Sequence, residues 1–181
     1  MKFVEINLKG AYVIEPELKS DERGFFARTF CKHEFDEHGL NSNLVQCNIS
    51  YNKTRGTLRG MHFQHSPNAE AKLVRCTQGA VFDVIVDLRE NSKTFAKWVG
   101  VELSAENRKA VYVPEGFAHG YLTLTDNAEV SYQVSEFYSP KCESGINWND
   151  TSVNIQWPFQ PVLVSEKDQN HMPMKALVNS L

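Results

Sequence analysis

The sequence predicts an all-β fold, a sandwich or a barrel, with a few short helices attached to it. Many short segments combine β-branched or aromatic residues with flanking turn residues, and their spacing along the chain is fairly even. This pattern favours antiparallel sheets over alternating strand and helix units. The candidate strands are Ala11–Ile14, Gly24–Phe30, Leu44–Ser50, Thr57–Gln64, Lys72–Thr77, Ala80–Leu88, Trp98–Leu103, Ala110–Val113, Gly120–Leu124 and Glu129–Tyr138.

Two of these segments show the two-residue period of a strand clearly. Within Val81–Leu88, the acidic residues Asp83 and Asp87 share one face, and the other face carries Phe82, Val84, Val86 and Leu88. Within Val130–Tyr138, the side chain of Tyr132 points the same way as the neighbouring valines. We therefore expect Tyr132 to point into the fold.

Helical segments are scarce. Lys32–His38, which Gly39 stops, has the length of about two turns. Ser165, Glu166, Lys167 and Asp168 form a capping box that opens a short helix near the C-terminus. Both helices are expected to lie on the outside of the β-structure.

Composition limits the classes of function. The chain has 19 Lys and Arg against 22 Asp and Glu, a net charge of -3, without long runs of either sign, so neither nucleic acid nor a membrane is expected as a partner. No segment has the apolar length of a signal peptide or a membrane span, which predicts a cytoplasmic protein. The 181 residues contain no linker or repeat, so we expect one domain over residues 1–181. The four cysteines lack close pairs and are expected to be reduced.

Five segments place reactive or charged side chains on strands or at strand ends. A barrel lined by such residues has a polar interior, which is typical of a barrel that holds a ligand. These segments are Asp21–Phe26, Arg59–Gln64, Glu70–Arg75, Pro114–Gly120 and Ser165–Asp168.

His62 is the first candidate for chemistry. A single histidine on a strand is more often a structural residue, but Arg59 and Lys72 lie close to it in the sequence. Arg suits a phosphate and Lys a developing oxyanion, so all three side chains suit one anionic ligand. Regular pleating would put Arg59 and His62 on opposite faces, and they can share a pocket only if Gly60 marks a bulge or kink.

The segment Pro114–His119 has the Pro-x-Gly-x-x-His spacing of the second cupin motif, which points to a jelly-roll barrel. Metal-binding cupins have two histidines separated by one residue in their first motif, whereas His62 and His65 are separated by two. On a regular strand these two side chains would lie on opposite faces and could not bind one internal metal ion.

The ordered combination of motifs resembles the dTDP-4-dehydrorhamnose 3,5-epimerase family. The matching segments are Arg23–Phe26, Gln46–Asn48, Arg59–Gln64, Lys72–Arg75, Val113–Gly120, Tyr138–Pro140 and Lys167–Asp168. The resemblance implies a cupin-type jelly roll, a homodimer that exchanges N-terminal strands, and activity without a metal or other cofactor. It also implies a nucleotide-sugar substrate and epimerisation beside the C4 ketone of a 6-deoxyhexose.

The resemblance further implies a role for each site residue. His62 would be the base, Asp168 would hold its tautomer, Lys72 would stabilise the enolate, and Tyr132 would return a proton from the opposite face. Inversion of a carbon needs two such groups on opposite sides of the sugar. The implied substrate-binding residues are Arg23 and Arg59 for the pyrophosphate, and Phe26, Arg28, Gln46, Asn48, His119, Tyr138, Glu143 and Lys167.

Arg28 departs from the family pattern, which usually has a glutamate there that helps to recognise the nucleotide base. An acceptor has become a charged donor, so the identity of the base stays open, as does the choice between C3 and C5.

Structural alternatives also stay open for several residues. Asp168 could serve only its capping box, Tyr132 only the core, Lys72 only the solvated surface, and Arg23 only a turn. Two other functions are a metal-dependent, oxygenase-like cupin that uses His62, His65, Glu70 and His119, and a non-catalytic module that binds nucleotide sugars.

Overall fold

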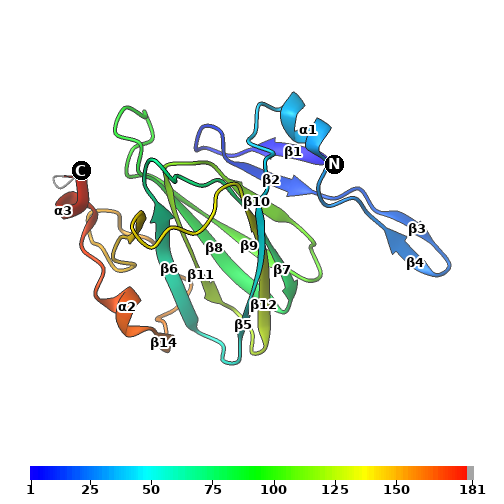
Figure 1. The fold of residues 1–181 in the computed structure, drawn as a ribbon. Helices are drawn as coiled ribbons and strands as arrows, with labels where there is room; N and C mark the ends of the chain where they lie inside the picture. The colour runs from blue at the N-terminus through cyan, green and yellow to red at the C-terminus, as the bar shows by residue number, and fades with distance from the viewer. Residues whose placement is uncertain (179–181) are drawn as a thin grey trace.

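The structure, a computed structural model, describes residues 1–178. Two antiparallel sheets dominate it and face one another as a flattened barrel (Figure 1). The first sheet contains, in order, β1 (Lys2–Glu5), β2 (Tyr12–Glu15), β10 (Ala110–Val113), β7 (Lys72–Gln78), β12 (Ala128–Val134) and β5 (Gln46–Asn52). The second contains β13 (Glu143–Gly145), β6 (Thr57–Gln64), β11 (Phe117–Thr123), β8 (Ala80–Asp87) and β9 (Trp98–Ser104), and β14 (Leu163–Val164) pairs with β6 in parallel.

The remaining elements lie outside these sheets. A hairpin of β3 (Lys19–Asp21) and β4 (Gly24–Phe26) projects from the barrel (Figure 1). The helices are short: α1 (Lys32–Glu37), α2 (Glu166–Gln169) and α3 (Met174–Val178). Among residues 1–178, no helix has the length and apolar character that crossing a membrane requires.

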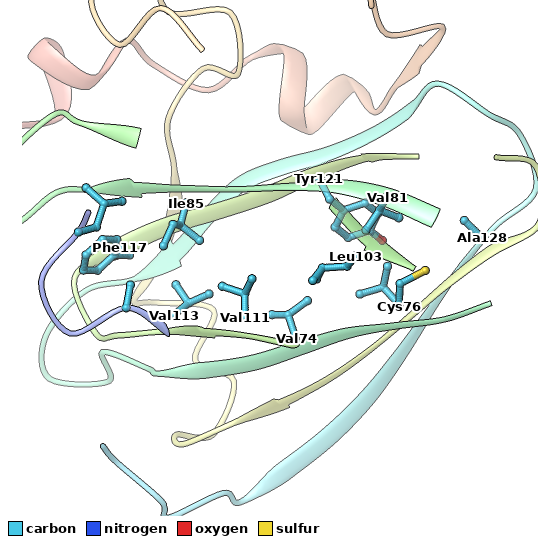
Figure 2. Close-up of a cluster of buried hydrophobic side chains, with 13 residues drawn as sticks. Val74, Cys76, Val81, Ile85, Leu103, Val111, Val113, Phe117, Tyr121 and Ala128 are labelled. Carbon is cyan, nitrogen blue, oxygen red and sulfur yellow. The ribbon is translucent and has the colours of Figure 1, made fainter. Parts of the chain in front are cut away.

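The main core lies between the two sheets (Figure 2). Val74, Val111 and Val130 from the first sheet pack with Ile85 and Phe117 from the second. On β8, Val81 and Ile85 point into this core, whereas Val84 and Val86 belong to a second cluster on the outer face. The alternation along β8 that the sequence predicts is therefore confirmed.

Both outer faces carry smaller apolar clusters. The region of α1 covers part of the first sheet, where Phe35 packs against Leu73 and Tyr112. The segment after β13 covers part of the second sheet through Ile146 and Val153. The helices are thus attachments to a β-structure, as expected.

The all-β jelly-roll prediction is confirmed, with corrections to the ends of several strands. The predicted strand Gly120–Leu124 begins at Phe117, because its pairing with β8 reaches Asp87, and Leu44–Ser50 is shifted to Gln46–Asn52 along its pairing with β12. The predicted strand Gly24–Phe30 ends at Phe26, because β3, with which it pairs, begins opposite that residue at Lys19. The predicted strand Glu129–Tyr138 ends at Val134, because its pairing with both neighbours stops at Gln46 and Lys72. Pattern alone did not reveal the short strands β1, β3, β13 and β14, which are too short to show alternation.

Candidate active site

A polar cavity opens between the two sheets. Its lining residues are Ser50, Arg59, His62, Lys72, His119, Gly120, Tyr121 and Tyr132. A neighbouring cavity shares His62, Lys72 and Tyr132 and adds Gln46, Asn48, Phe63, Gln64, Glu70, Val134, Tyr138 and Glu143. Because His62 lies on the second sheet and Tyr132 on the first, the two rings approach this space from opposite walls.

His62 forms a dyad with Asp168. Nε2 of His62 lies 2.6 Å from Oδ1 of Asp168, whose other oxygen accepts a hydrogen bond from the Gly60 N–H at 3.2 Å. Burial alone would raise the pKa of Asp168, but the hydrogen bonds from His62 and Gly60 lower it. An ionised carboxylate can only accept, so Nε2 carries the ring proton and Nδ1 is left with a free lone pair. His62 is therefore in the tautomer that a base requires.

Helix α2 delivers Asp168 to this position. Ser165 caps the helix by accepting a hydrogen bond from the backbone N–H of Asp168 at 3.1 Å. Among the described residues, the predicted capping box forms only in part: Ser165 caps the Asp168 N–H, whereas the Asp168 carboxylate binds His62 and Gly60 instead of the Ser165 N–H. Asp168 therefore does not serve only the helix cap, because its carboxylate binds His62.

An irregularity in β6 brings Arg59 and His62 to the same cavity. Across the β6–β11 pair, His62 is opposite His119 and Arg59 is opposite Tyr121, so β6 contains one extra residue in this stretch. Gly60 lies within it with a positive φ of 134°. This is the bulge at Gly60 that a shared pocket requires.

Lys72 is buried at the cavity wall rather than solvated. It is 8% exposed, and its Nζ lies 3.1 Å from Oε1 of Glu70. On the same sheet, burial raises the pKa of the Tyr132 hydroxyl, and the charge of Glu70 adds to this effect. The phenol is therefore protonated at neutral pH and able to act as an acid.

Two further side chains are held in place by buried partners. Nε of Arg59 donates to Oδ1 of Asn52 at 2.8 Å, which fixes the guanidinium at the cavity. Nε2 of His119 lies 2.8 Å from Oδ2 of Asp83, a carboxylate that is 1% exposed. His119 is thus a second histidine oriented by a buried aspartate.

The outer part of the cavity is built from polar side chains. Tyr138 donates its hydroxyl proton to Oε2 of Glu143 at 2.8 Å, and Lys167 lies 2.6 Å from Oε1 of the same carboxylate. Gln46 accepts a hydrogen bond from the Tyr138 N–H. These contacts join the loop after β12 to β5, β13 and α2 around the cavity mouth.

Comparison with known proteins identifies the relatives of this chain. The family model for dTDP-4-dehydrorhamnose 3,5-epimerase matches residues 5–176. The dTDP-4-dehydrorhamnose 3,5-epimerase of Methanothermobacter thermautotrophicus is 48% identical over 177 residues, which cover 96% of this chain and 95% of the relative. The chain belongs to the dTDP-4-dehydrorhamnose 3,5-epimerase family.

Solved structures of this family share the fold closely. The dTDP-4-dehydrorhamnose 3,5-epimerase of Elizabethkingia anophelis is 47% identical and superposes with a TM-score of 0.94, covering 97% of both chains. A dTDP-6-deoxy-D-glucose-3,5-epimerase of Legionella pneumophila, solved in complex with dTDP-4-keto-L-rhamnose, is 38% identical with a TM-score of 0.90 and covers 96% of this chain and 93% of its own.

Three residues implied by the family resemblance lie outside this cavity in the single chain. Arg23, Phe26 and Arg28 belong to the β3–β4 hairpin or directly follow it. Arg23 is exposed and pairs with Asp21, and Arg28 lies 3.7 Å from Glu34. None of the three lines the cavity around His62, and their role in binding stays a prediction.

The histidines proposed for a metal-dependent cupin do not converge. Among residues 1–178, the only group of three His, Cys, Asp or Glu side chains with ligand atoms close together is His62, Asp168 and His171. It contains neither His65 nor His119. The geometry thus gives no support to the metal-binding set of the oxygenase-like alternative.

Sequence reasoning missed several residues of the site. Asp83 is one, although the alternation along β8 placed it opposite the outer apolar face and so signalled an inward carboxylate. The sequence places Glu70 in a charged segment and among the candidate metal ligands, but it does not predict the ion pair with Lys72. Ser50 and Tyr121, whose hydroxyls lie 2.8 Å apart, also line the cavity.

Proposed function

We propose that this chain epimerises a nucleotide-linked 4-keto-6-deoxyhexose at C3, at C5 or at both. The observation that carries this proposal is the placement of His62 and Tyr132 on opposite walls of one cavity. A carbon between them can lose a proton to one side and gain a proton from the other.

The chemistry follows from the ketone. Nδ1 of His62 takes the proton from the carbon beside C4, the C–H electrons form the enolate, and the negative charge develops on O4. Lys72 stabilises that oxygen, and the Tyr132 hydroxyl gives a proton to the opposite face of the same carbon. General acid or base action contributes about 10²–10⁴-fold and one oxyanion donor about 3 kcal/mol, so the groups must act together.

The substrate class rests on the polar cavity and on the family. The Legionella pneumophila relative was solved with dTDP-4-keto-L-rhamnose. We propose the same class of nucleotide sugar for this chain, with Arg59 as a ligand of the pyrophosphate. Bidentate guanidinium donors suit phosphate oxygens, and Asn52 holds Arg59 at the cavity.

We also propose that the active form is a homodimer in which the β3–β4 hairpin reaches the cavity of the partner. The hairpin exposes Phe25 and Phe26, at 47% and 66%, and the uncovered part of the first sheet exposes Ile49 at 68%. Exposed apolar side chains of this size favour an interface. Arg23 and Arg28 would then act on the nucleotide in the other subunit.

A cytoplasmic location is part of the proposal. All four cysteines, Cys31, Cys47, Cys76 and Cys142, are free. Free thiols are typical of proteins from reducing compartments.

Deuterium exchange tests the reaction. The purified chain is incubated in deuterated water with dTDP-, CDP- and GDP-linked 4-keto-6-deoxyhexoses, and NMR locates the deuterium. We expect incorporation beside the ketone of at least one substrate, its loss in His62→Asn, and exchange without inversion in Tyr132→Phe. His65→Asn, on a histidine outside the cavity, is the matched control. Absence of exchange with every sugar would refute the proposal.

Mixing two inactive variants tests the role of the hairpin. Arg23→Ala and His62→Asn are unfolded together and refolded as a mixture. Half of the dimers are then mixed, and each holds one cavity with an intact His62 and an intact partner hairpin. We expect recovery of about a quarter of wild-type activity. If Arg23 acts in its own subunit, no intact cavity forms and the mixture stays inactive.

A further inference from the structure

A second imidazole reaches the carboxylate that orients His62. His171 lies between α2 and α3, and its Nε2 is 3.7 Å from Oδ1 of Asp168, the oxygen that lies 2.6 Å from Nε2 of His62. The two imidazole rings are 5.6 Å apart between centroids and meet edge to face at 75°. Two ring nitrogens therefore converge on one carboxylate oxygen.

The position of His171 is set by the backbone beneath it. Gly145 on β13 pairs with His62 on β6, and a Cβ at Gly145 would lie 2.5 Å from Nε2 of His171. The absence of that side chain gives the ring its place next to His62. Nε2 of His171 is buried there without a hydrogen-bond partner among the described residues.

We propose that His62, Asp168 and His171 form a binding site for a divalent transition metal of the zinc class. Nε2 of His62 lies 2.6 Å and Nε2 of His171 lies 3.7 Å from Oδ1 of Asp168, and the three residues offer ligand atoms within 4.8 Å of one another. Ligand atoms of a tetrahedral zinc ion lie about 3.3 Å apart, so side-chain rotations that move these atoms by about 1 Å bring them around one ion. Two imidazoles, one carboxylate and a water molecule are a usual tetrahedral set for zinc. Binding also gives the buried Nε2 of His171 a partner.

The surroundings suit such an ion. The Gly60 N–H holds the second oxygen of Asp168, which orients the carboxylate as partners around a metal site do. The nearby ammonium of Lys167 is neutralised by Glu143, which lies 2.6 Å away. The site thus carries the negative charge of Asp168 to attract a cation. It differs from the set of histidines that the cupin motif indicated.

Metal binding prevents His62 from acting as a base; this consequence rests on the proposed function. The ion takes the Nε2 lone pair of His62, and the proton of Nε2 moves to Nδ1, so the ring stays neutral. Nδ1 then carries a proton and can no longer accept one from the sugar. Binding of the metal and abstraction of the proton exclude one another.

Metal affinity is measured first, because it does not require activity. The full chain is freed of metal with a chelator, and zinc is titrated against a competing chromophoric chelator. We expect one zinc ion per chain. His171→Phe keeps the ring on Gly145 without a ligand atom and should weaken binding by at least about tenfold. His65→Phe is the matched control and should bind zinc as the wild type does.

A wild-type chain that takes no zinc from the competitor overturns the proposal. Equal affinity in His171→Phe also overturns it. If His171→Phe does not fold, His171→Ala supplies the same comparison with a smaller side chain, and thermal unfolding checks both variants.

Inhibition is measured second, by deuterium exchange with and without zinc. We expect zinc to stop exchange by the wild type, a chelator to restore it, and His171→Phe to exchange at the same rate with and without zinc. Equal zinc sensitivity of the two proteins contradicts the proposal. Zinc binding through His171 in a chain that exchanges no deuterium would refute the proposed function alone.

Discussion

Replacing Asp168 by asparagine tests how the dyad works. In Asp168→Asn the side chain keeps its shape, but one oxygen becomes an NH₂ group. The Gly60 N–H donates to Oδ2 of Asp168 at 3.2 Å, so that position must keep an acceptor. The new amide therefore turns its NH₂ toward Nε2 of His62, which then has to accept. The proton of the ring moves to Nδ1, and the base is blocked.

The size of the loss in exchange rate distinguishes two roles of Asp168: control of the His62 tautomer, and simple attraction between the carboxylate and the His62 ring. A hydrogen bond to a charged group contributes about 1.5–3 kcal/mol, and its loss in Asp168→Ala should slow exchange by about 10- to 150-fold. Blocking the base should cost more, about 10⁴-fold, the loss that follows the same Asp-to-Asn change in a serine protease triad. We therefore expect the asparagine variant to be slower than the alanine variant.

The assay is deuterium incorporation under single-turnover conditions, with thermal unfolding measured in parallel. Glu166→Gln, which alters an exposed carboxylate of the same helix, is the control and should exchange normally. An asparagine variant as fast as the alanine variant, or faster, would show that Asp168 does not act through the tautomer of His62.

Three further predictions concern charge, acid stability and capping. Lys72→Met should slow exchange by about 100-fold or more, because one oxyanion donor is lost. When Glu70→Gln is added to Lys72→Met, the free energy of unfolding should return to the wild-type value, but the exchange rate should stay low. Burial would raise the pKa of Asp87, but hydrogen bonds from neighbouring donors lower it to about 2, from an ordinary 3.8. Since the folded pKa is the lower one, the carboxylate stabilises the fold by about 2 kcal/mol above pH ~4, and this stabilisation is lost as the pH falls to about 2. In urea unfolding, Asp87→Asn should be less stable at neutral pH, and its stability should change less between these two pH values; an unchanged acid slope would contradict this. Ser165→Ala should cost about 1 kcal/mol of stability through the lost cap of α2 and should lower kcat with little change in KM; a normal kcat would show that the cap does not position the dyad.

The sequence alone predicted only part of the cavity wall, through the alternation of side chains along a strand. Alternation placed Tyr132 inward, and the glycine at position 60 marked the place where Arg59 and His62 could share a face. Asp168 lies far along the chain from His62, and only the family resemblance connected them. A local sequence pattern cannot show that two residues so far apart in the chain are in contact in the fold.

The residues that the sequence did not predict show the same limit of local patterns. His171 follows α2 in an irregular segment, where no period predicts the direction of a side chain. Its place depends on Gly145, a residue of a different strand. The hairpin residues Arg23 and Arg28 fail to reach the cavity for another reason, because in the proposed dimer their site belongs to a second chain.

The site finally depends on the close contact of two glycines. A Cβ at Gly60 would lie 2.5 Å from Cα of Gly120, and one at Gly120 would lie 2.7 Å from the Arg59 carbonyl oxygen. Side chains at either position would push β6 and β11 apart just where the extra residue of β6 turns His62 toward the cavity. That displacement would separate His62 from Asp168 and from Tyr132 across the cavity. The irregular strand that lets Arg59 and His62 share a pocket therefore requires glycine at both position 60 and position 120.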